Sequence, residues 1–245
     1  MTDIHCHILP GVDDGAEDLE ESLAMAVQAV HSGLRNIIAT PHFQGRPGEL
    51  EKLPEFSRRL DRLKQALMLE KIPLGIHPGA EILCLPETVE LARRGQLPTL
   101  GETSYVLCEF FFDAPYEFMD RILSDIAAAG YRIVVAHPER YEAVIRDPRC
   151  ARHWFRQGYV IQLDKGSVLG AFGGRVQSCA RWLLDMGFVH MIASDAHSPR
   201  RRTTDLTFLQ SWLLERYPEG YVNLLLKENP RRLLRNGDMV PAEQV

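Results

Sequence analysis

Two histidines stand one residue apart near the start of the chain, His5 and His7 in the stretch DIHCHILPG. Successive side chains of a strand point to opposite faces, so a strand here would place both imidazoles on one face and Ile4 and Cys6 on the other. The pair is therefore either a binding site or a coincidence, and the residues at the ends of the other predicted strands decide between the two.

Imidazole and carboxylate side chains recur where the other predicted strands end. The candidates are His5, His7, Asp14, His42, Glu81, Glu109, His137, Asp195 and His197. A single residue of this kind is usually structural, and the remaining histidines are interpreted in that way: His31, His77, His153 and His190. Gathered in one place, so many candidates would repel one another or lose solvation unless divalent cations bind them. At about four to six ligands for each ion, water included, the set fits two or three ions.

Several close cations imply a reaction. Two cations about 3.5–4 Å apart lower the pKa of a bridging water and hold the attacking and leaving oxygens of a phosphoryl displacement. An anionic substrate also needs cationic side chains, and Arg140 follows His137 while the RRR run at 200–202 follows His197. Because the planar guanidinium suits phosphate oxygens, we favour phosphate binding over a solvated surface patch.

Short apolar runs alternate with amphipathic segments along the chain. Strands are predicted at Thr2–His7, Asn36–Thr40, Leu74–His77, Tyr105–Glu109, Arg132–His137, Tyr159–Leu163 and His190–Ser194. Helices are predicted at Glu17–Ser32, from Leu53 to Leu67, at Tyr116–Ala129, at Arg175–Met186 and in the final LLLKENPRRLLRN, and Gly33, Gly130 and Gly187 stand where C-terminal caps belong. Runs such as IVVA are apolar throughout, which is typical of parallel strands covered on both faces.

This alternation predicts an α/β fold, a parallel βα barrel of seven strands in a single domain over residues 1–245. No Gly-rich dinucleotide fingerprint follows the first strand, which disfavours an open Rossmann sheet. The C-terminal strand ends of such a barrel meet at one mouth, where the active site lies. The barrel would therefore bring the candidate ligands together.

The composition limits the class of function. With 45% hydrophobic and 25% charged residues the chain is an ordinary globular protein, and its net charge of -5 argues against a nucleic-acid partner. We find no apolar run of about 18 residues and no signal peptide before His5, so we expect a cytoplasmic protein without membrane insertion.

The five cysteines have neither disulfide nor zinc-finger spacing. Cys150 and Arg156 match the C-x5-R spacing of cysteine-dependent phosphatases. The intervening ARHWF lacks the glycines that let backbone N–H groups surround a phosphate. We therefore predict a helix there, and no catalytic cysteine.

The motifs DIHCHILPGVDDG, IATPH, GAEI, LCEF, AHPERY, GSVLGAFG and IASDAH, in this order, resemble the PHP (polymerase and histidinol phosphatase) superfamily. More narrowly, from Met1 to about Phe208, they are similar to its bacterial protein-tyrosine phosphatases of capsule and exopolysaccharide operons. The resemblance implies a distorted seven-stranded, TIM-like βα barrel with three metals, usually Mn²⁺, with Fe, Zn, Co or Mg as alternatives. It also implies hydrolysis of phosphotyrosine on the tyrosine autokinase that controls polysaccharide synthesis.

The resemblance also implies a role for each candidate residue. One metal would be held by His5, His7, Glu81 and Asp195, a second by Glu81, Glu109 and His137, and the third by Asp14, His42 and His197. Arg140 and Arg202 match the substrate arginines of the family.

Two stretches depart from the family pattern. In SPRRRT no glycine precedes the arginine, which leaves the choice among Arg200, Arg201 and Arg202 open. In QLDKGS, Asp164 and Lys165 stand where small or amide residues are more usual. Whether these two residues contact substrate is also open.

We hypothesise that a metal-bridging hydroxide attacks phosphorus in line while arginines and cations hold the non-bridging oxygens. Three alternatives remain open: a PHP phosphoesterase for a small metabolite such as histidinol phosphate, a metal-dependent nuclease, and a non-catalytic metal module. The sequence of the motifs disfavours the small-metabolite phosphoesterase, and the acidic net charge disfavours the nuclease. The complete set of candidate ligands disfavours the non-catalytic module. We make no prediction of the oligomeric state.

Overall fold

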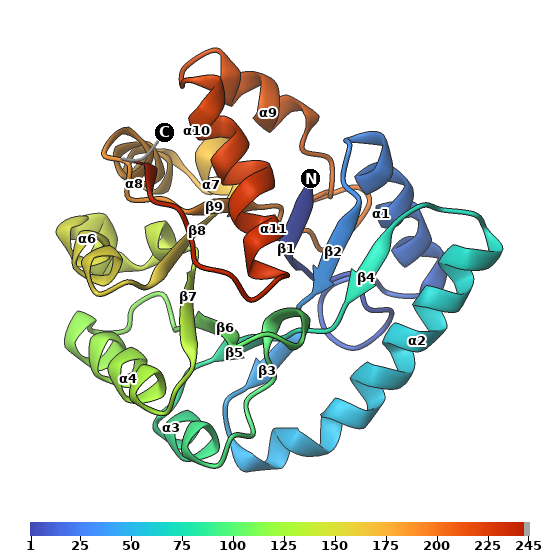
Figure 1. Ribbon diagram of the computed structural model, residues 1–245, viewed down its shortest axis with the longest axis horizontal. Coiled ribbons are helices and arrows are strands. Elements are labelled where there is room, and N and C mark those ends of the chain that lie inside the picture. The colour runs from blue at the N-terminus through green and yellow to red at the C-terminus, as the bar shows by residue number, and fades with distance from the viewer. Residues whose placement is uncertain (243–245) are drawn as a thin grey trace.

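The computed structural model describes residues 1–242 and contains parallel β-strands surrounded by helices (Figure 1). In the described residues the strands are β1 (Thr2–Cys6), β2 (Asn36–Ala39), β3 (His42–Gln44), β4 (Gly75–His77), β5 (Glu81–Leu83), β6 (Tyr105–Glu109), β7 (Arg132–Ala136), β8 (Val160–Asp164) and β9 (Met191–Ala193). Every segment predicted as a strand forms one, and β3 and β5 are additional. The predicted α/β class with parallel strands is confirmed.

The predicted closed barrel of seven strands is not confirmed, because the described residues form nine strands. The strands form two sheets, ordered β1-β2-β4 and β3-β5-β6-β7-β8-β9. Pro41 separates β2 from β3, and Pro78 with Gly79 separates β4 from β5. Because proline has no N–H for the ladder, each of these extended segments is interrupted and its two halves are paired in different sheets.

Two links join the sheets. A single parallel bridge between Cys6 and Ala196 connects β1 to the residues that follow β9. On the other side, the N–H of Glu81 donates to the carbonyl of Pro41 at 3.1 Å. The strands therefore follow one another around a common centre.

An apolar cluster fills that centre. Its buried members are Ile4, Ile38, Leu100, Tyr105, Leu107, Val134, Ala136, Val160, Met191, Ala193 and Leu233. A larger cluster, which includes Cys6, packs between the strands and the surrounding helices. The prediction that Ile4 and Cys6 share a face is therefore wrong. The pairing register of β1 with β2 shifts between Asp3 and Cys6, and this irregularity interrupts the alternation of side chains.

The predicted helices are present with small changes at their ends. They are α1 (Leu19–His31), α2 (Leu53–Leu69), α4 (Tyr116–Ala128) and α8 (Gly174–Asp185), together with α6 (Arg149–Arg156) and, in the final segment, α11 (Asn229–Leu233). Additional helices are α3 (Pro86–Arg93), α5 (Glu142–Arg146), α7 (Lys165–Leu169), α9 (Thr207–Leu214) and α10 (Glu219–Asn223). The helix α1 begins after Asp18, whose carboxylate accepts from the N–H of Glu21 at 3.0 Å. None of the helices in residues 1–242 is both long and apolar enough to cross a bilayer.

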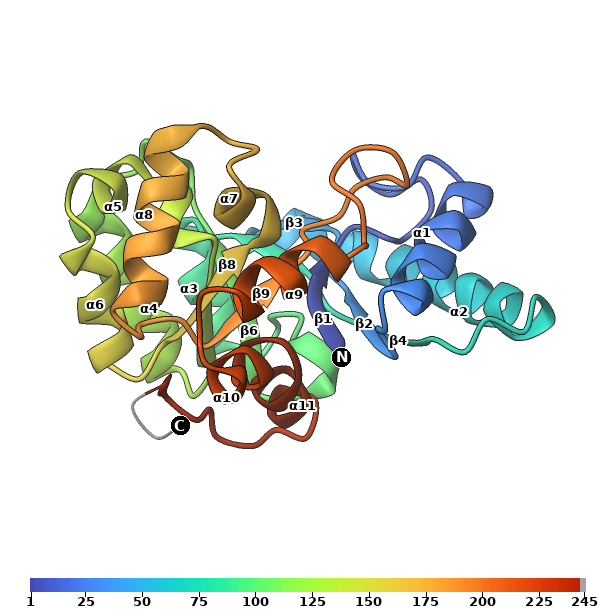
Figure 2. The ribbon, with the colours of Figure 1, turned by 90° about the horizontal axis from the view of Figure 1, so that it is seen from above.

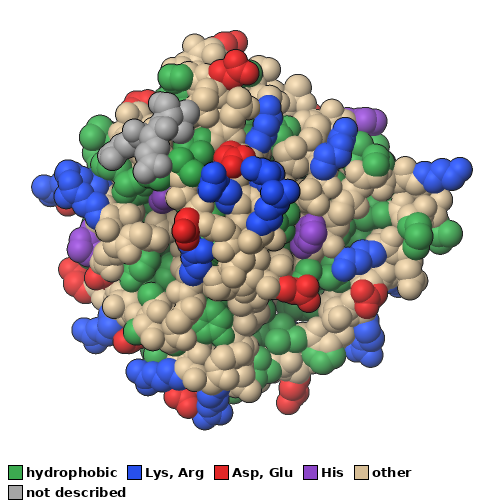
Figure 3. Space-filling model, viewed as in Figure 1, with side chains coloured by type: hydrophobic (Ala, Val, Ile, Leu, Met, Phe, Trp, Pro, Cys, Tyr) green, Lys and Arg blue, Asp and Glu red, His purple; other side chains and the backbone are tan. Residues whose placement is uncertain are grey.

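The C-terminal helices close the end of the strands that bears the N-terminus (Figure 2). The predicted final helix is a continuous helical segment in which a π turn, Leu224–Glu228, joins α10 to α11. Pro230 cannot donate to the α-helical ladder, and the π turn ends two residues before it. Leu233 enters the central apolar cluster. On this face, acidic and basic side chains are interspersed over the surface (Figure 3). Within the C-terminal helices, Arg231 and Arg232 pair with Glu228.

Candidate active site

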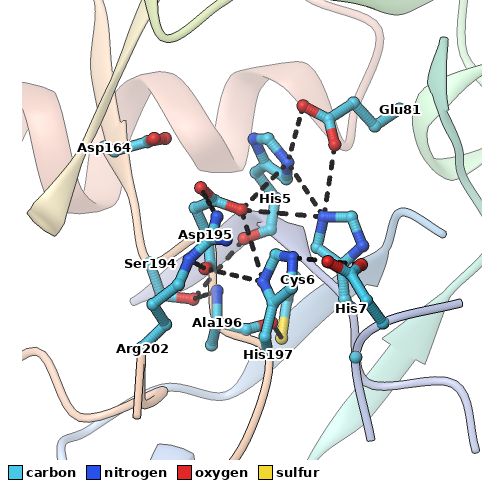
Figure 4. Close-up of polar contacts among 12 residues, drawn as sticks. His5, Cys6, His7, Glu81, Asp164, Ser194, Asp195, Ala196, His197 and Arg202 are labelled. Atoms are coloured by element: carbon cyan, nitrogen blue, oxygen red, sulfur yellow. Dashed lines mark hydrogen bonds and ion pairs between the residues drawn. The ribbon is translucent and has the colours of Figure 1, made fainter. Parts of the chain in front are cut away.

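The first group of predicted ligands surrounds Glu81 at the start of β5. The Nε2 atoms of His5 and His7 lie 3.3 Å apart, and each lies close to the Glu81 carboxylate, at 3.2 Å and 3.3 Å. The Asp195 carboxylate lies 3.5 Å from Nε2 of His5. Figure 4 shows these side chains pointing toward one another. Despite the irregular register of β1, its two histidines converge as predicted.

A second group shares Glu81. Nε2 of His137 lies 2.8 Å from one Glu81 oxygen and 3.7 Å from Glu109. Nδ1 of His42 lies 3.1 Å from the other Glu81 oxygen and 3.7 Å from Glu109. The Glu81 carboxylate therefore faces imidazoles on both sides, which is the arrangement expected of a ligand shared between two metals.

The third group lies nearer to the surface. Asp14 is 3.3 Å from Nε2 of His42 and 3.5 Å from Nε2 of His197. The other ring nitrogen of His197 lies 3.6 Å from Asp195. Together with His7, these residues form a cluster whose ligand atoms all lie within 4.8 Å of one another. The structure thus brings together all the predicted ligands, from segments far apart in sequence.

The rings of His5 and His7 each have a side-chain partner at Nδ1, the nitrogen that points away from the cluster. Nδ1 of His5 is 3.0 Å from Oε1 of Gln162, and Nδ1 of His7 is 2.8 Å from Asp13. Partners of this kind fix the tautomer and aim the opposite nitrogen at the site. A Cβ at Gly15 would lie 2.1 Å from the carbonyl oxygen of His7, so only glycine lets this loop close against β1.

The sequence analysis missed Asp13 and Gln162, whose side chains orient two of the candidate ligands. The DD pair in the loop after β1 contained the signal for Asp13. Gln162, in contrast, lies on a strand 157 residues away from His5, and nothing in its local sequence marks it.

Three residues of the site have left-handed backbones. His137, Asp195 and Arg202 have φ values of 35°, 49° and 50°. Residues other than glycine seldom adopt this conformation, which costs about 1–3 kcal/mol and is concentrated at functional sites. The fold maintains strained turns where β7 and β9 end, and these turns direct the side chains into the cluster.

The close approach of the groups shifts their pKa values in opposite directions. Burial by itself would lower the pKa of His7, but hydrogen bonds with Asp13 and Glu81 raise it to about 9. Burial, together with the nearby charge of His7, lowers the pKa of His197 to about 2. Burial and the neighbouring Asp164 raise the pKa of Asp195 to about 6. Such shifts are typical of sites where cations and protons compete for the same donors.

The guanidinium group of Arg140 contacts four side chains, two carboxylates and two aromatic rings. Its Nη1 lies 3.3 Å from both Asp164 and Asp195. Its guanidinium carbon lies 4.4 Å from the ring centre of Phe112 and 4.5 Å from that of Phe172. Stacking between two rings and pairing with two carboxylates fix the plane of the guanidinium. Arg140 is therefore preorganised at the edge of the cluster of candidate ligands.

Of the three consecutive arginines, Arg202 is the one that reaches the site. Its Nε donates to the carbonyl of Asp195 at 3.1 Å, and its Nη2 donates to the Asp195 carboxylate. Arg200 and Arg201 are exposed. Of the three candidates, Arg202 is therefore the one whose side chain lines the cavity.

A cavity of about 170 Å³ opens over the cluster. It is lined by Asp14, His42, Glu81, Glu109, Phe112, His137, Arg140, Asp195, His197 and Arg202. The deeper His5 and His7 are fully buried below it. The cavity is thus lined by candidate metal ligands together with the two predicted arginines.

The two residues that depart from the family pattern support the site from outside. Asp164 is buried between Arg140 and Gln162. The Lys165 amine donates to the backbone carbonyls of Thr203 and Asp205, so it anchors the loop that carries Arg202.

The C-x5-R match lies away from the cavity. Cys150 and Arg156 both belong to α6, as predicted, and neither lines the cavity. Burial raises the pKa of the Cys150 thiol to about 11, which keeps it protonated. The interpretation of His190 as structural also agrees with its surroundings, since it stacks on Phe155 and accepts from the N–H of Ile161.

Known proteins provide an independent comparison. The family model described as "Capsular polysaccharide synthesis, CpsB/CapC" matches residues 1–235. Tyrosine-protein phosphatase YwqE of Bacillus subtilis (strain 168) is 37% identical over 237 residues, covering 96% of this chain and 92% of that protein. Tyrosine-protein phosphatase CpsB of Streptococcus pneumoniae is 29% identical over 240 residues, covering 96% and 98%.

Solved structures agree with these matches. A crystal structure from a study of YwqE from Bacillus subtilis and CpsB from Streptococcus pneumoniae, "unique metal-dependent tyrosine phosphatases", matches with a TM-score of 0.85 at 35% identity and covers 98% of this chain and 97% of that one. A variant of organophosphorus hydrolase from Deinococcus radiodurans matches with a TM-score of 0.61 at 16% identity, covering 95% and 92%, which is a likeness of fold alone. The chain belongs to the CpsB/CapC family of capsular polysaccharide synthesis proteins.

Proposed function

We propose that this protein is a metal-dependent phosphatase that hydrolyses phosphotyrosine in proteins. The observation that carries the proposal is the cavity itself, in which imidazoles and carboxylates from separate strands lie beside Arg140 and Arg202. The names of the relatives support the same activity. A phosphate monoester needs both features, because its dianion must be neutralised while water attacks phosphorus.

The donor set fits metal ions. Mixed imidazole and carboxylate ligands suit Mn²⁺, Fe, Co and Zn, and we propose Mn²⁺ as the resident metal, in a cluster of three. One ion would be held by His5, His7, Glu81 and Asp195, a second by Glu81, Glu109 and His137, and a third by Asp14, His42 and His197. When bound, these ions supply an activated water and neutralise the charge that develops on the phosphoryl oxygens.

The side chains of the cavity orient the substrate. Arg140 and Arg202 present N–H groups to the phosphoryl oxygens, and the rings around Arg140 prevent it from swinging away. The Asp195 carboxylate bridges the two guanidinium groups and so fixes the spacing between them. We propose that this spacing lets the arginines grip different oxygens of one phosphate.

We also interpret the two sheets as one distorted barrel. If β2 with β3 and β4 with β5 are each counted as one interrupted strand, the order around the centre has seven members. The Cys6–Ala196 bridge and the central apolar cluster support this interpretation. It places the candidate ligands at the mouth, where βα barrels bind substrate.

The name of the family suggests the substrate. We propose that it is the phosphotyrosine-bearing autokinase that controls capsular or exopolysaccharide synthesis, and that the reaction takes place in the cytoplasm. A small phosphate ester such as histidinol phosphate would fill the same cavity, so the two substrate classes must be compared directly.

The decisive experiment measures metal content and activity in the same preparation. We expect the protein to bind Mn²⁺, to release phosphate from a phosphotyrosine peptide faster than from histidinol phosphate, and to leave supercoiled plasmid intact. EDTA should abolish the activity and Mn²⁺ should restore it. Glu81→Gln should lower both metal content and activity, whereas Glu87→Gln, an exposed change on α3, should alter neither. A metal-loaded protein that does not hydrolyse the peptide would contradict the proposal.

A further inference from the structure

A second hollow lies beside the catalytic cavity. Its volume is about 320 Å³, and it shares Arg202 with the cavity. Leu169, Ala171, Phe172 and Phe208 provide its apolar surface. It forms where α7 and the loop after it meet the first turn of α9, and these two helices are neighbours (Figure 1).

The side chain of Phe172 forms the partition between the two spaces. Its ring lies 4.5 Å from the guanidinium carbon of Arg140 and 5.7 Å from that of Arg202. A Cβ at Gly166 would lie 2.8 Å from this ring, so the glycine in the KGS stretch leaves the room that the ring occupies. The hollow, which we call the Phe208 hollow, therefore adjoins the catalytic cavity and is separated from it by the Phe172 ring.

Lys165 is the lysine that lines the Phe208 hollow, and its amine already has hydrogen-bond partners within the protein. The Lys165 amine lines the hollow but donates to the carbonyls of Thr203 and Asp205, and its side chain is buried. Its hydrogen bonds leave the apolar atoms of Phe172 and Phe208 as the surface offered to an occupant. An apolar side chain fits this surface better than a charged one.

Exposed aromatic rings gather around the cavity. Within the described residues the exposed phenylalanines are Phe111, Phe112 and Phe208, with 57%, 42% and 69% of their surface accessible. Phe112 lines the cavity, Phe111 adjoins it in sequence, and Phe208 lines the neighbouring hollow. Exposed aromatic rings that adjoin a binding cavity are typical of a surface that binds another chain.

The size of the cavity shows where the rest of a substrate must lie. About 170 Å³ is enough for a phosphate and its aromatic ring, but not for the peptide that carries them. Residues of an extended peptide advance by about 3.3 Å each, so those next to the phosphotyrosine must lie on the rim. The Phe208 hollow is the part of that rim that shares the phosphate-binding Arg202.

We infer that the Phe208 hollow binds an apolar side chain that neighbours the phosphotyrosine in the substrate protein, and so sets sequence preference. The inference rests on the proposed phosphotyrosine phosphatase activity. The contact is remote from phosphorus and is made equally before and during the reaction, so it acts on KM and leaves kcat unchanged.

The test uses Mn²⁺-loaded full-length protein and two kinds of substrate. p-Nitrophenyl phosphate occupies the cavity alone, whereas phosphotyrosine peptides with leucine or aspartate scanned through the flanking positions also reach the rim. We expect the wild type to prefer leucine at one flanking position by about tenfold in kcat/KM. Phe208→Ser should remove this preference by raising KM for the leucine peptide, with p-nitrophenyl phosphate turnover unchanged.

Two further variants complete the design. Ala171→Asp places a charge in the hollow and should disfavour the leucine peptide in the same way, whereas Met68→Ser removes an exposed apolar side chain at the far end of α2 and should change nothing. A leucine preference that survives in both Phe208→Ser and Ala171→Asp, or its absence in the wild type, would overturn the inference alone. Failure to hydrolyse any phosphopeptide would overturn the proposed function, and the inference with it.

Discussion

Arg202→Ala is expected to lower kcat/KM for p-nitrophenyl phosphate by roughly 100-fold, whereas Arg200→Ala and Arg201→Ala should each change it by less than about threefold. Arg202 lines the cavity and bonds to Asp195 through both its Nε and its Nη2. Its two neighbours are exposed, so they are matched controls within the same run of arginines.

The magnitude follows from the position of the guanidinium. Loss of one preorganised donor to a developing oxyanion costs about 2.7–4 kcal/mol, and about 1.4 kcal/mol corresponds to a tenfold change in rate. The Arg202 side chain is 31% exposed, so solvent weakens its field and the lower end of this range applies. Arg140 remains in place to hold the phosphate and Asp195, and this limits the loss to roughly 100-fold.

The assay is steady-state hydrolysis at saturating Mn²⁺, with metal content and thermal midpoint measured for each variant. Because the backbone of Arg202 is left-handed, with φ of 50°, Arg202→Asn provides a second variant that preserves the turn. Both changes at 202 should lower activity while the metal content stays near that of the wild type. The reasoning would be refuted if Arg202→Asn kept full activity, or if Arg200→Ala or Arg201→Ala caused the large loss.

Three other outcomes are expected. Cys150→Ser should leave phosphatase activity unchanged, because this thiol lies on α6 away from the cavity; loss of activity at constant metal content would restore a cysteine mechanism. Asp13→Asn should lower Mn²⁺ affinity about 10- to 100-fold, measured by metal titration, because the carboxylate orients His7; unchanged affinity would contradict that role. Burial lowers the pKa of His190 to about 4, so the stability that its neutral form supports should be complete above about pH 6.5 and fall as the pH drops toward 4. His190→Asn should reduce this acid sensitivity by up to about 1.4 kcal/mol per pH unit, measured by urea unfolding, and an equal pH dependence in both proteins would exclude His190 as its source.

The sequence predicted those parts of the fold that local patterns determine. Apolar runs such as IVVA are long enough to identify a buried strand on their own, and glycines mark the ends of helices. The strands β3 and β5 have three residues each, directly beyond Pro41 and the Pro78–Gly79 pair. Such segments become strands through pairing with each other and with β6, so only the tertiary structure reveals them.

The candidate ligands could be predicted because each lies at the end of a predicted strand or shortly after it, while the residues that orient them could not. Gln162 lies within the apolar run of β8, and its role depends on His5, at the other end of the chain. Phe172 lies in a loop between helices, and its importance comes from Arg140 and Gly166, which it contacts only in the folded state. Residues that orient other residues are identified by their contacts in the folded protein, because nothing in the neighbouring sequence marks them.

The choice among three identical arginines shows the same limit most clearly, since type and local composition are the same for all of them. The backbone of the loop from His197 to Arg202 determines which arginine reaches the site. The Ser198 hydroxyl accepts from the N–H of Arg201 at 2.9 Å and donates to its carbonyl at 2.7 Å, which closes a turn, and the N–H of His197 donates to the carbonyl of Arg202 at 2.8 Å. The left-handed φ at Arg202 completes the reversal and directs this one side chain back to Asp195. The Ser-Pro pair that begins the loop predicts a turn, but the folded loop alone determines which arginine faces the cavity.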